Sequence, residues 1–200
     1  AEQVPGGVAW SGDMNTCYRA NLESRLATRV LWKIAEGRYQ DERDIYRLAY
    51  AQTWAKWFEV QRTMRVYVTA IRSELKSLEF TTLKIKDAIC DHFRAVIGER
   101  PSIDTQNPDV RVHAFLTKDR VTLYLDTSGE PLYKRGFKNA RVEAPIKENL
   151  AAGIIKISCW QPDEPFFDPM CGSGTFLLEA AQIALNIAPG LGRSFAFEKF

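Results

Sequence analysis

The sequence predicts an α+β region over residues 1 to about 140, followed by the truncated start of a doubly wound α/β domain. Strand-like and helix-like patterns alternate through the first part. Two segments with period two, VRVHAFL and VTLYLD, flank the short connection TKDR, which is typical of a hairpin. In the second part, the apolar segment FFD leads into DPMCGSGT and then into a helical pattern, an order typical of ligand-binding α/β domains.

The first elements are the end of a strand, VAW at residues 8–10, and two helices. The first helix is predicted over residues 15–35, because apolar side chains recur there at every fourth position, and Gly37 is expected to end it. The second helix is predicted over residues 42–58. Residues 64–71 are rich in β-branched side chains and predict a strand.

A third helix is predicted over residues 82–97, after a loop with the sequence SELKSLEF. Gly98 is expected to close this helix. The hairpin strands are then predicted over residues 110–116 and 121–126, and SGEP forms the next turn.

The second part starts after a basic joint, which we place at Lys134–Arg141. Pro145 is expected near the first turn of a fourth helix that ends at about residue 157. The short strand FFD and a fifth helix, TFLLEAAQIALNI, follow.

Composition sets limits on the class of protein. The 46% hydrophobic share supports a folded core in one or two domains and excludes global disorder. The net charge of +2 is too small to predict a nucleic-acid partner, so that prediction has to come from clustered charges.

Cysteine and histidine usage argues against a metal site. The four cysteines form no CxxC pair and the chain has two histidines, so no zinc site is predicted. Scattered cysteines, with no signal peptide and no apolar run of about 20 residues, predict a cytoplasmic protein without membrane association. The chain starts without Met and stops abruptly, so we expect it to be a piece of a longer protein.

The glycine loop DPMCGSGT is the strongest candidate for a ligand site. It lacks the lysine of a phosphate-binding P-loop, and Leu177 occupies the third glycine position of a dinucleotide fingerprint. Amides around Gly172 to Thr175 at a helix start favour a carboxylate, and Asp168 can accept from an ammonium group. S-adenosylmethionine (SAM) presents both groups. The alternative is a tight strand–helix turn that binds nothing.

The segment YKRGFKNAR places basic and aromatic side chains close together. Cationic side chains bind phosphates and aromatic rings stack on bases, so the segment is a candidate for RNA contact. The alternative is a solvated linker with ordinary surface charges.

Three motifs, LYLDTSGEPLYKRGF, APIKENLAAGII and DPMCGSGT, closely resemble those of the THUMP-domain class I RNA methyltransferases. Within that family the chain is most similar to bacterial 23S rRNA guanine-N2 methyltransferases of the RlmL type, which have often been labelled N6-adenine DNA methylases. The resemblance extends from GVAWSGD to FAFEKF. It implies a partial ferredoxin-like region at residues 1–60, an RNA-binding THUMP domain at 61–140, and the truncated start of a Rossmann-like SAM-dependent methyltransferase domain at 141–200.

The resemblance also implies roles for particular residues. The residues implied to bind SAM are Asp168, Pro169, Cys171, Gly172, Ser173, Gly174 and Thr175. Together with the basic, aromatic composition, it favours RNA contact by Lys134, Arg135, Phe137, Lys138 and Arg141.

The chain departs from the family in one respect. Guanine-N2 transfer in the family uses an Asn/Asp-Pro-Pro-Phe/Tyr motif, and no two prolines are adjacent in this chain. We therefore assign no catalytic residue and expect the chain alone to be inactive. An RNA-binding module without catalysis and a DNA N6-adenine methyltransferase remain alternatives, although a THUMP-like segment argues against DNA.

Overall fold

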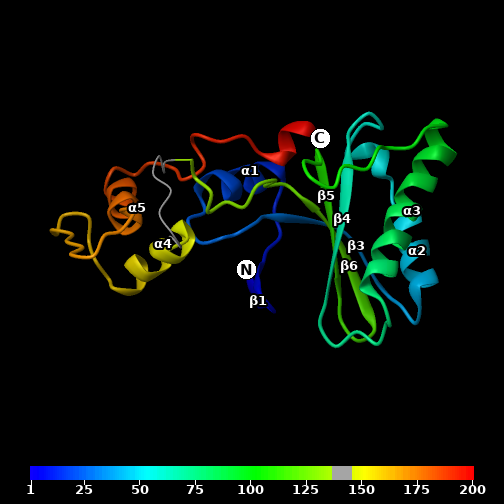
Figure 1. Cartoon of the computed structure of the whole chain (residues 1–200), viewed down its shortest axis with the longest axis horizontal. Coiled ribbons are helices and arrows are strands. Elements are labelled where there is room, and N and C mark those ends of the chain that lie inside the picture. Colours follow the sequence, from blue (N-terminus) through cyan, green and yellow to red (C-terminus); the bar gives the residue numbers. More distant parts are fainter. Residues whose placement is uncertain (137–145) are drawn as a thin grey trace. The chain divides into compact units, whose positions relative to one another are not determined.

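The structure is a computed structural model that describes residues 1–136 and 146–200. The chain divides into two compact units, each built from segments that are distant in the sequence. Unit 1 comprises Ala1–Val30 and Glu130–Ser194, and unit 2 comprises Leu31–Gly129 and Phe195–Phe200. The two units are described separately below (Figure 1).

Unit 2 is a four-stranded mixed sheet with two helices on one face. Its elements, in chain order, are β3 (Leu31–Arg38), α2 (Glu42–Tyr50), η1 (Trp54–Lys56), β4 (Met64–Ala70), α3 (Leu78–Ile97), β5 (Val110–Leu116), β6 (Arg120–Asp126) and η2 (Ala196–Lys199). The strand order is β3-β6-β5-β4. The pair β4 and β5 is parallel and therefore needs a crossover, which α3 provides. Figure 1 shows α2 and α3 on the same side of this sheet.

The core of unit 2 lies between the sheet and these helices. Alternate side chains of β4, β5 and β6 are buried there, against α2 and α3. Trp54 is fully buried, and its indole nitrogen donates to the carbonyl of Ala49 at 2.7 Å. Ser77 caps α3 by accepting a hydrogen bond from the backbone N–H of Phe80 at 3.1 Å. The helix ends at Gly98, whose φ of 87° is left-handed.

The predicted helix over residues 15–35 is wrong in its second half. The helix α1 (Met14–Glu23) ends at Ser24, and the next apolar residues belong to β3, which pairs with β6. A spacing of four residues fits one face of a helix, but it is also a multiple of the strand period of two. Gly37, expected to end the helix, lies inside β3, where the side chain of Leu48 is 3.3 Å from the position of an added Cβ.

The other predictions for unit 2 agree better with the structure. The strand at 64–71 and the hairpin are confirmed as β4, β5 and β6. The second helix starts as predicted but stops at Tyr50. The third helix starts at Leu78, four residues before the prediction, because Ser77 caps it.

The part of unit 1 that the structure describes contains a small hairpin and three helices. The strands β1 (Glu2–Val4) and β2 (Gly7–Ala9) are antiparallel. The later helices are α4 (Glu148–Ile157) and α5 (Thr175–Ala184), which pack against each other. Both were predicted, although Pro145 lies outside the described residues.

The predicted strand FFD is not a strand in the structure. Phe167, in the middle of this apolar segment, is 85% exposed, and residues 165–168 form no strand. A parallel strand is stable only beside hydrogen-bonded neighbours, and no segment of unit 1 that the structure describes supplies one.

The domain boundaries predicted at residues 60 and 140 stay a prediction. Residue 60 lies within unit 2, between η1 and β4, and residue 140 lies outside the described residues. Among the described residues, no helix has both the length and the apolar character needed to cross a bilayer.

Candidate functional site

The glycine loop is folded by two local hydrogen bonds. Asp168 Oδ1 accepts from the backbone N–H of Met170 at 3.0 Å. The N–H of Gly174 donates to the carbonyl of Cys171 at 2.7 Å, and α5 begins at the next residue, Thr175. The loop therefore turns sharply and delivers its backbone to the N-terminal end of a helix.

The start of α5 is open. Its N-cap residue, Gly174, is left-handed (φ 71°, ψ 21°), and no side chain caps the helix. Gly172 also has a positive φ of 52°, and no heavy atom lies within 4 Å of an added Cβ at either glycine. The first amides of a helix carry partial positive charge and bind anions. The loop therefore fits the carboxylate end of an amino-acid-like ligand that approaches the backbone closely.

The remaining residues predicted to bind SAM lie on the same loop. Pro169 and Cys171 are exposed, whereas Thr175 is buried. The hydroxyls of Ser173 and Thr175 are 3.1 Å apart. Direct contact of these side chains with a cofactor stays a prediction.

Lys134 and Arg135, the first two basic residues of the basic segment, lie in different environments. Lys134 is exposed, and its ammonium group lies 2.7 Å from the carboxylate of Glu130. Arg135 is buried, with a side chain that is 1% exposed. The other residues predicted to contact RNA, which are Phe137, Lys138 and Arg141, lie outside the described residues.

Arg135 belongs to a buried charge cluster that the sequence did not reveal. Its Nη1 lies 2.7 Å from Oε2 of Glu179, and Nη1 of Arg25 lies 3.6 Å from the same oxygen. Arg135 Nη2 also donates to the carbonyl of Arg25 at 2.7 Å. Arg25 donates in turn to the carbonyls of Gln182 and Ile187 at and beyond the end of α5. The cluster therefore joins three separate segments of unit 1, which are the residues after α1, the segment before residue 137, and α5.

Burial and ion pairing act in opposite directions on this cluster. Burial raises the pKa of the Glu179 carboxyl and lowers the pKa values of Arg25 and Arg135, because loss of water disfavours every charged form. Attraction within the cluster opposes each shift. Because arginine stays protonated in proteins, the guanidinium groups depend on Glu179 for compensation. Arg135 is thus committed to a structural contact, which argues against its direct contact with RNA.

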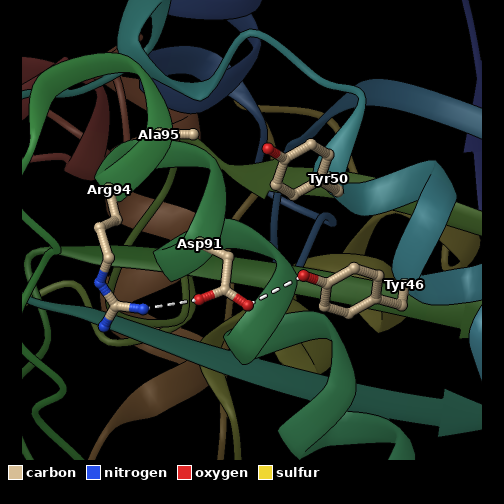
Figure 2. Close-up of a pocket in the computed structure, with 5 residues that line it drawn as sticks. All are labelled: Tyr46, Tyr50, Asp91, Arg94 and Ala95. Atoms are coloured by element: carbon tan, nitrogen blue, oxygen red, sulfur yellow. Dashed lines mark hydrogen bonds and ion pairs between the residues drawn. The ribbon is translucent and has the colours of Figure 1, made fainter.

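Unit 2 carries an open hollow of about 400 Å³ between α2 and α3. Figure 2 shows the residues that line it. The hydroxyl of Tyr46 donates to Asp91 at 2.9 Å, and Arg94 donates to the same carboxylate at 3.0 Å. The ring of Tyr50 stacks on that of Tyr46 with centroids 6.0 Å apart. None of these residues was a predicted site residue, although the spacings i, i+4 and i, i+3 on helices could have indicated the pairs.

The described residues hold no candidate metal centre. Within residues 1–136 and 146–200, no group of at least three His, Cys, Asp or Glu side chains is placed to hold a metal ion.

Three protein-family models match successive parts of the chain. They are the RlmL ferredoxin-like domain at residues 1–31, the THUMP domain at residues 39–126, and the RMKL-like methyltransferase domain at residues 135–199. The matches agree with the order of domains that the sequence motifs imply, and with the mixed α/β fold.

A curated relative is similar over the whole chain. The chain is 45% identical over 200 residues to a protein of Psychromonas ingrahamii named ribosomal RNA large subunit methyltransferase K/L. The match covers all of this chain but 27% of that protein, so the chain spans about a quarter of its relative's length.

Solved structures show the same fold. A Listeria monocytogenes protein described as a predicted N6-adenine-specific DNA methylase is 34% identical, with a TM-score of 0.83 over 94% of this chain and 50% of that one. The protein SMU.472, described as a methyltransferase and crystallised in complex with SAH, is 35% identical, with the same TM-score and coverage. The chain therefore contains an RlmL ferredoxin-like domain, a THUMP domain and the start of an RMKL-like methyltransferase domain, and it is similar over its whole length to an rRNA methyltransferase.

Proposed function

We propose that the whole protein is a SAM-dependent rRNA methyltransferase that acts in the cytoplasm on the exocyclic N2 of a guanine in 23S rRNA. The observation that carries this proposal is the uncapped start of α5 behind Gly172 and Gly174, within a methyltransferase-family domain. A similar protein crystallised with SAH supports SAM as the cofactor. The THUMP match and the rRNA methyltransferase relative support RNA as the substrate.

SAM would supply the methyl group. The backbone amides from Gly172 to Thr175 would bind its carboxylate, and the two glycines would let it approach without a side chain in the way. Asp168 would accept from its ammonium group. These contacts would fix the orientation of SAM, and a fixed orientation lowers the entropic part of the barrier to methyl transfer.

The residues that would orient the acceptor amine are not in this chain, since it contains no two adjacent prolines. We therefore propose that these 200 residues alone transfer no methyl group. An RNA-binding module without catalysis would have no use for an open α5 start. A DNA N6-adenine methyltransferase is the second candidate, favoured by the description of the Listeria structure, whereas the THUMP match favours RNA.

The cofactor part of the proposal is tested by titrating the whole protein with SAM in a calorimeter. Gly174→Val places a β-branched side chain at a left-handed position over the helix start, so we expect SAM affinity to fall at least tenfold. Gly192→Val is the matched control, because Gly192 also has open space around it but has no positive φ. Absence of heat with the unmodified protein, or equal affinity in both variants, would refute this SAM site.

The substrate part is tested with labelled SAM and two acceptors, a 23S rRNA fragment and duplex DNA. Methyl transfer to guanine N2 in the RNA supports the proposal. Transfer to adenine in the DNA would favour the second candidate, and turnover by the 200-residue chain itself would contradict the assignment of the acceptor site to other residues.

A further inference from the structure

The sheet of unit 2 has a second face that α2 and α3 do not cover (Figure 1). Because side chains alternate along a strand, the residues between the buried core positions point to this face. The register of the strands places Lys33, Tyr124, His113 and Tyr67 next to one another, in one row across all four strands. We call this row and its neighbours the open sheet face.

Two rings of the row, those of Tyr67 and His113, are held in place by contacts with each other and with charged neighbours. The rings of Tyr67 and His113 stack with centroids 5.0 Å apart and planes 14° apart. The guanidinium of Arg65 lies 4.7 Å from the centroid of the Tyr67 ring. His113 Nε2 also lies 3.6 Å from the buried carboxylate of Asp126. These contacts order the aromatic groups before any ligand binds, which lowers the entropy lost on binding.

Charge on the open sheet face is strongly one-sided. Arg65 lies opposite Arg111 in the register, and Arg38 lies opposite Arg120. Like charges directly opposite each other destabilise a sheet, so an anionic partner bound over these two pairs would be favoured. Two carboxylates lie among them. Glu36 is paired with Lys33 at 3.0 Å and with Arg120 at 2.5 Å, and the buried Asp126 lies beside His113. The covering helices are different, since α2 and α3 together carry as many acidic as basic side chains.

Aromatic rings beside cationic groups on a four-stranded sheet suit one kind of occupant. Unpaired RNA offers base faces for stacking and phosphates for ion pairing. A duplex offers a flat sheet its phosphates and sugars, while its base faces stay inside the stack. An acidic protein surface would use the cations but would have little use for the aromatic row.

We propose that the open sheet face binds an unpaired RNA segment, with a base stacked on Tyr124 beside the ordered Tyr67–His113 pair and phosphates paired with Lys33, Arg65 and Arg111. This proposal rests on the proposed function, in which the protein acts on RNA, and it names the surface that unit 2 uses. The surface is separate in sequence from Lys134 and from the glycine loop.

The test measures binding of a fluorescent single-stranded 12-nucleotide RNA to the 200-residue chain by anisotropy, at several salt concentrations. Loss of one base stack weakens single-strand binding roughly fivefold to a hundredfold, so we expect Tyr124→Leu to raise Kd within that range. Tyr67→Leu removes the ring that orders His113 and Arg65 and should also raise Kd. Tyr124→Phe keeps the ring and should bind as the unmodified chain does. Tyr50→Leu is the matched control, because Tyr50 is a half-exposed tyrosine on the opposite, helical side of unit 2.

Lys33→Gln tests the proposal independently of core packing, because the Lys33 side chain is 58% exposed and its ion-pair partner Glu36 stays paired with Arg120 in the variant. Loss of one phosphate contact should reduce the slope of log K against log salt by about 0.7. Lys84→Gln on α3 is its control. Unchanged Kd in both tyrosine variants together with an unchanged slope in Lys33→Gln would overturn the proposal, as would stronger binding of a 12-base-pair RNA duplex than of the single strand.

The outcomes separate this inference from the function on which it rests. If the unmodified chain binds single-stranded RNA and every open-face variant binds equally well, only the inference fails. If the chain binds no RNA and the whole protein also methylates none, the proposed function fails as well.

Discussion

Replacement of Glu179 by Gln is the sharpest test of how unit 1 is held together. The change keeps the size of the side chain but removes the carboxylate that both Arg25 and Arg135 contact. Two guanidinium groups would then share the site, with the weaker attraction between Glu148 and Arg135 as the remaining compensation. A glutamine oxygen could still accept a hydrogen bond, but it carries no charge to offset their burial.

The cost follows from the burial of the pair. The side chains of Arg135 and Glu179 are 1% and 2% exposed, and their atoms meet at 2.7 Å. Removing one partner of a buried ion pair costs about 3–5 kcal/mol. For a unit of this size, 1 kcal/mol shifts Tm by about 4–8 °C, so unit 1 should melt at least about 12 °C lower.

Hydrogen exchange at the amides of α5 measures this cost within unit 1. Glu23→Gln is the control, because it makes the same chemical change in an exposed pair with Arg19, where a loss of at most about 1 kcal/mol is expected. Amides of α3 in unit 2 should keep their protection in both variants. If Glu179→Gln lowered the free energy of opening no more than Glu23→Gln does, the cluster would not be the support that its burial indicates.

Three further predictions concern single groups. Burial and the hydrogen bond to Asp91 raise the pKa of Tyr46 to about 12. The stability that this hydroxyl contributes to unit 2 should be complete below pH 10 and lost as pH rises through about 12. Absorbance titration of the unmodified chain and of Tyr46→Phe checks this. The hydrogen bond from Lys199 lowers the pKa of Asp109 to about 2. The stability from this contact should be present above about pH 4 and lost as pH falls through 2. The free energy of unfolding in urea should therefore depend less on acid pH in Asp109→Asn. Lys134→Glu should weaken RNA binding and reduce its salt slope without changing Tm, because the side chain is exposed; anisotropy and calorimetry together test this, and unchanged binding would remove Lys134 from the RNA surface.

Much of unit 2 could be predicted because its patterns allow a single reading. The hairpin strands alternate strictly, and only a strand buries every second residue on one face. The apolar pattern over residues 15–35 is compatible with both a helix and a strand. Apolar side chains four residues apart satisfy both periods, and pairing with β6, which lies about 90 residues later, decided between them.

The candidate sites differ in how far the sequence could predict them. The glycine loop is a contiguous motif whose letters specify its turns, so it could be located by sequence alone. The open sheet face consists of residues from four strands, and only the register makes Lys33 a neighbour of Tyr124. The prediction of a strand at FFD is wrong for a related reason, since a strand depends on hydrogen-bonded neighbouring strands that its own sequence does not contain.

Arg135 shows that a basic motif does not by itself assign a role to each of its charges. Lys134 and Arg135 are adjacent, yet one ammonium lies at the surface and one guanidinium is buried against Glu179. A phosphate could reach Arg135 only by displacing Glu179, which would leave a carboxylate buried beside a second anion. Replacing both Lys134 and Arg135 by Glu would therefore put a new carboxylate beside that of Glu179 in one buried site and unfold unit 1. Any loss of RNA binding in that double variant would report on folding. Only the change at Lys134 can separate RNA contact from stability.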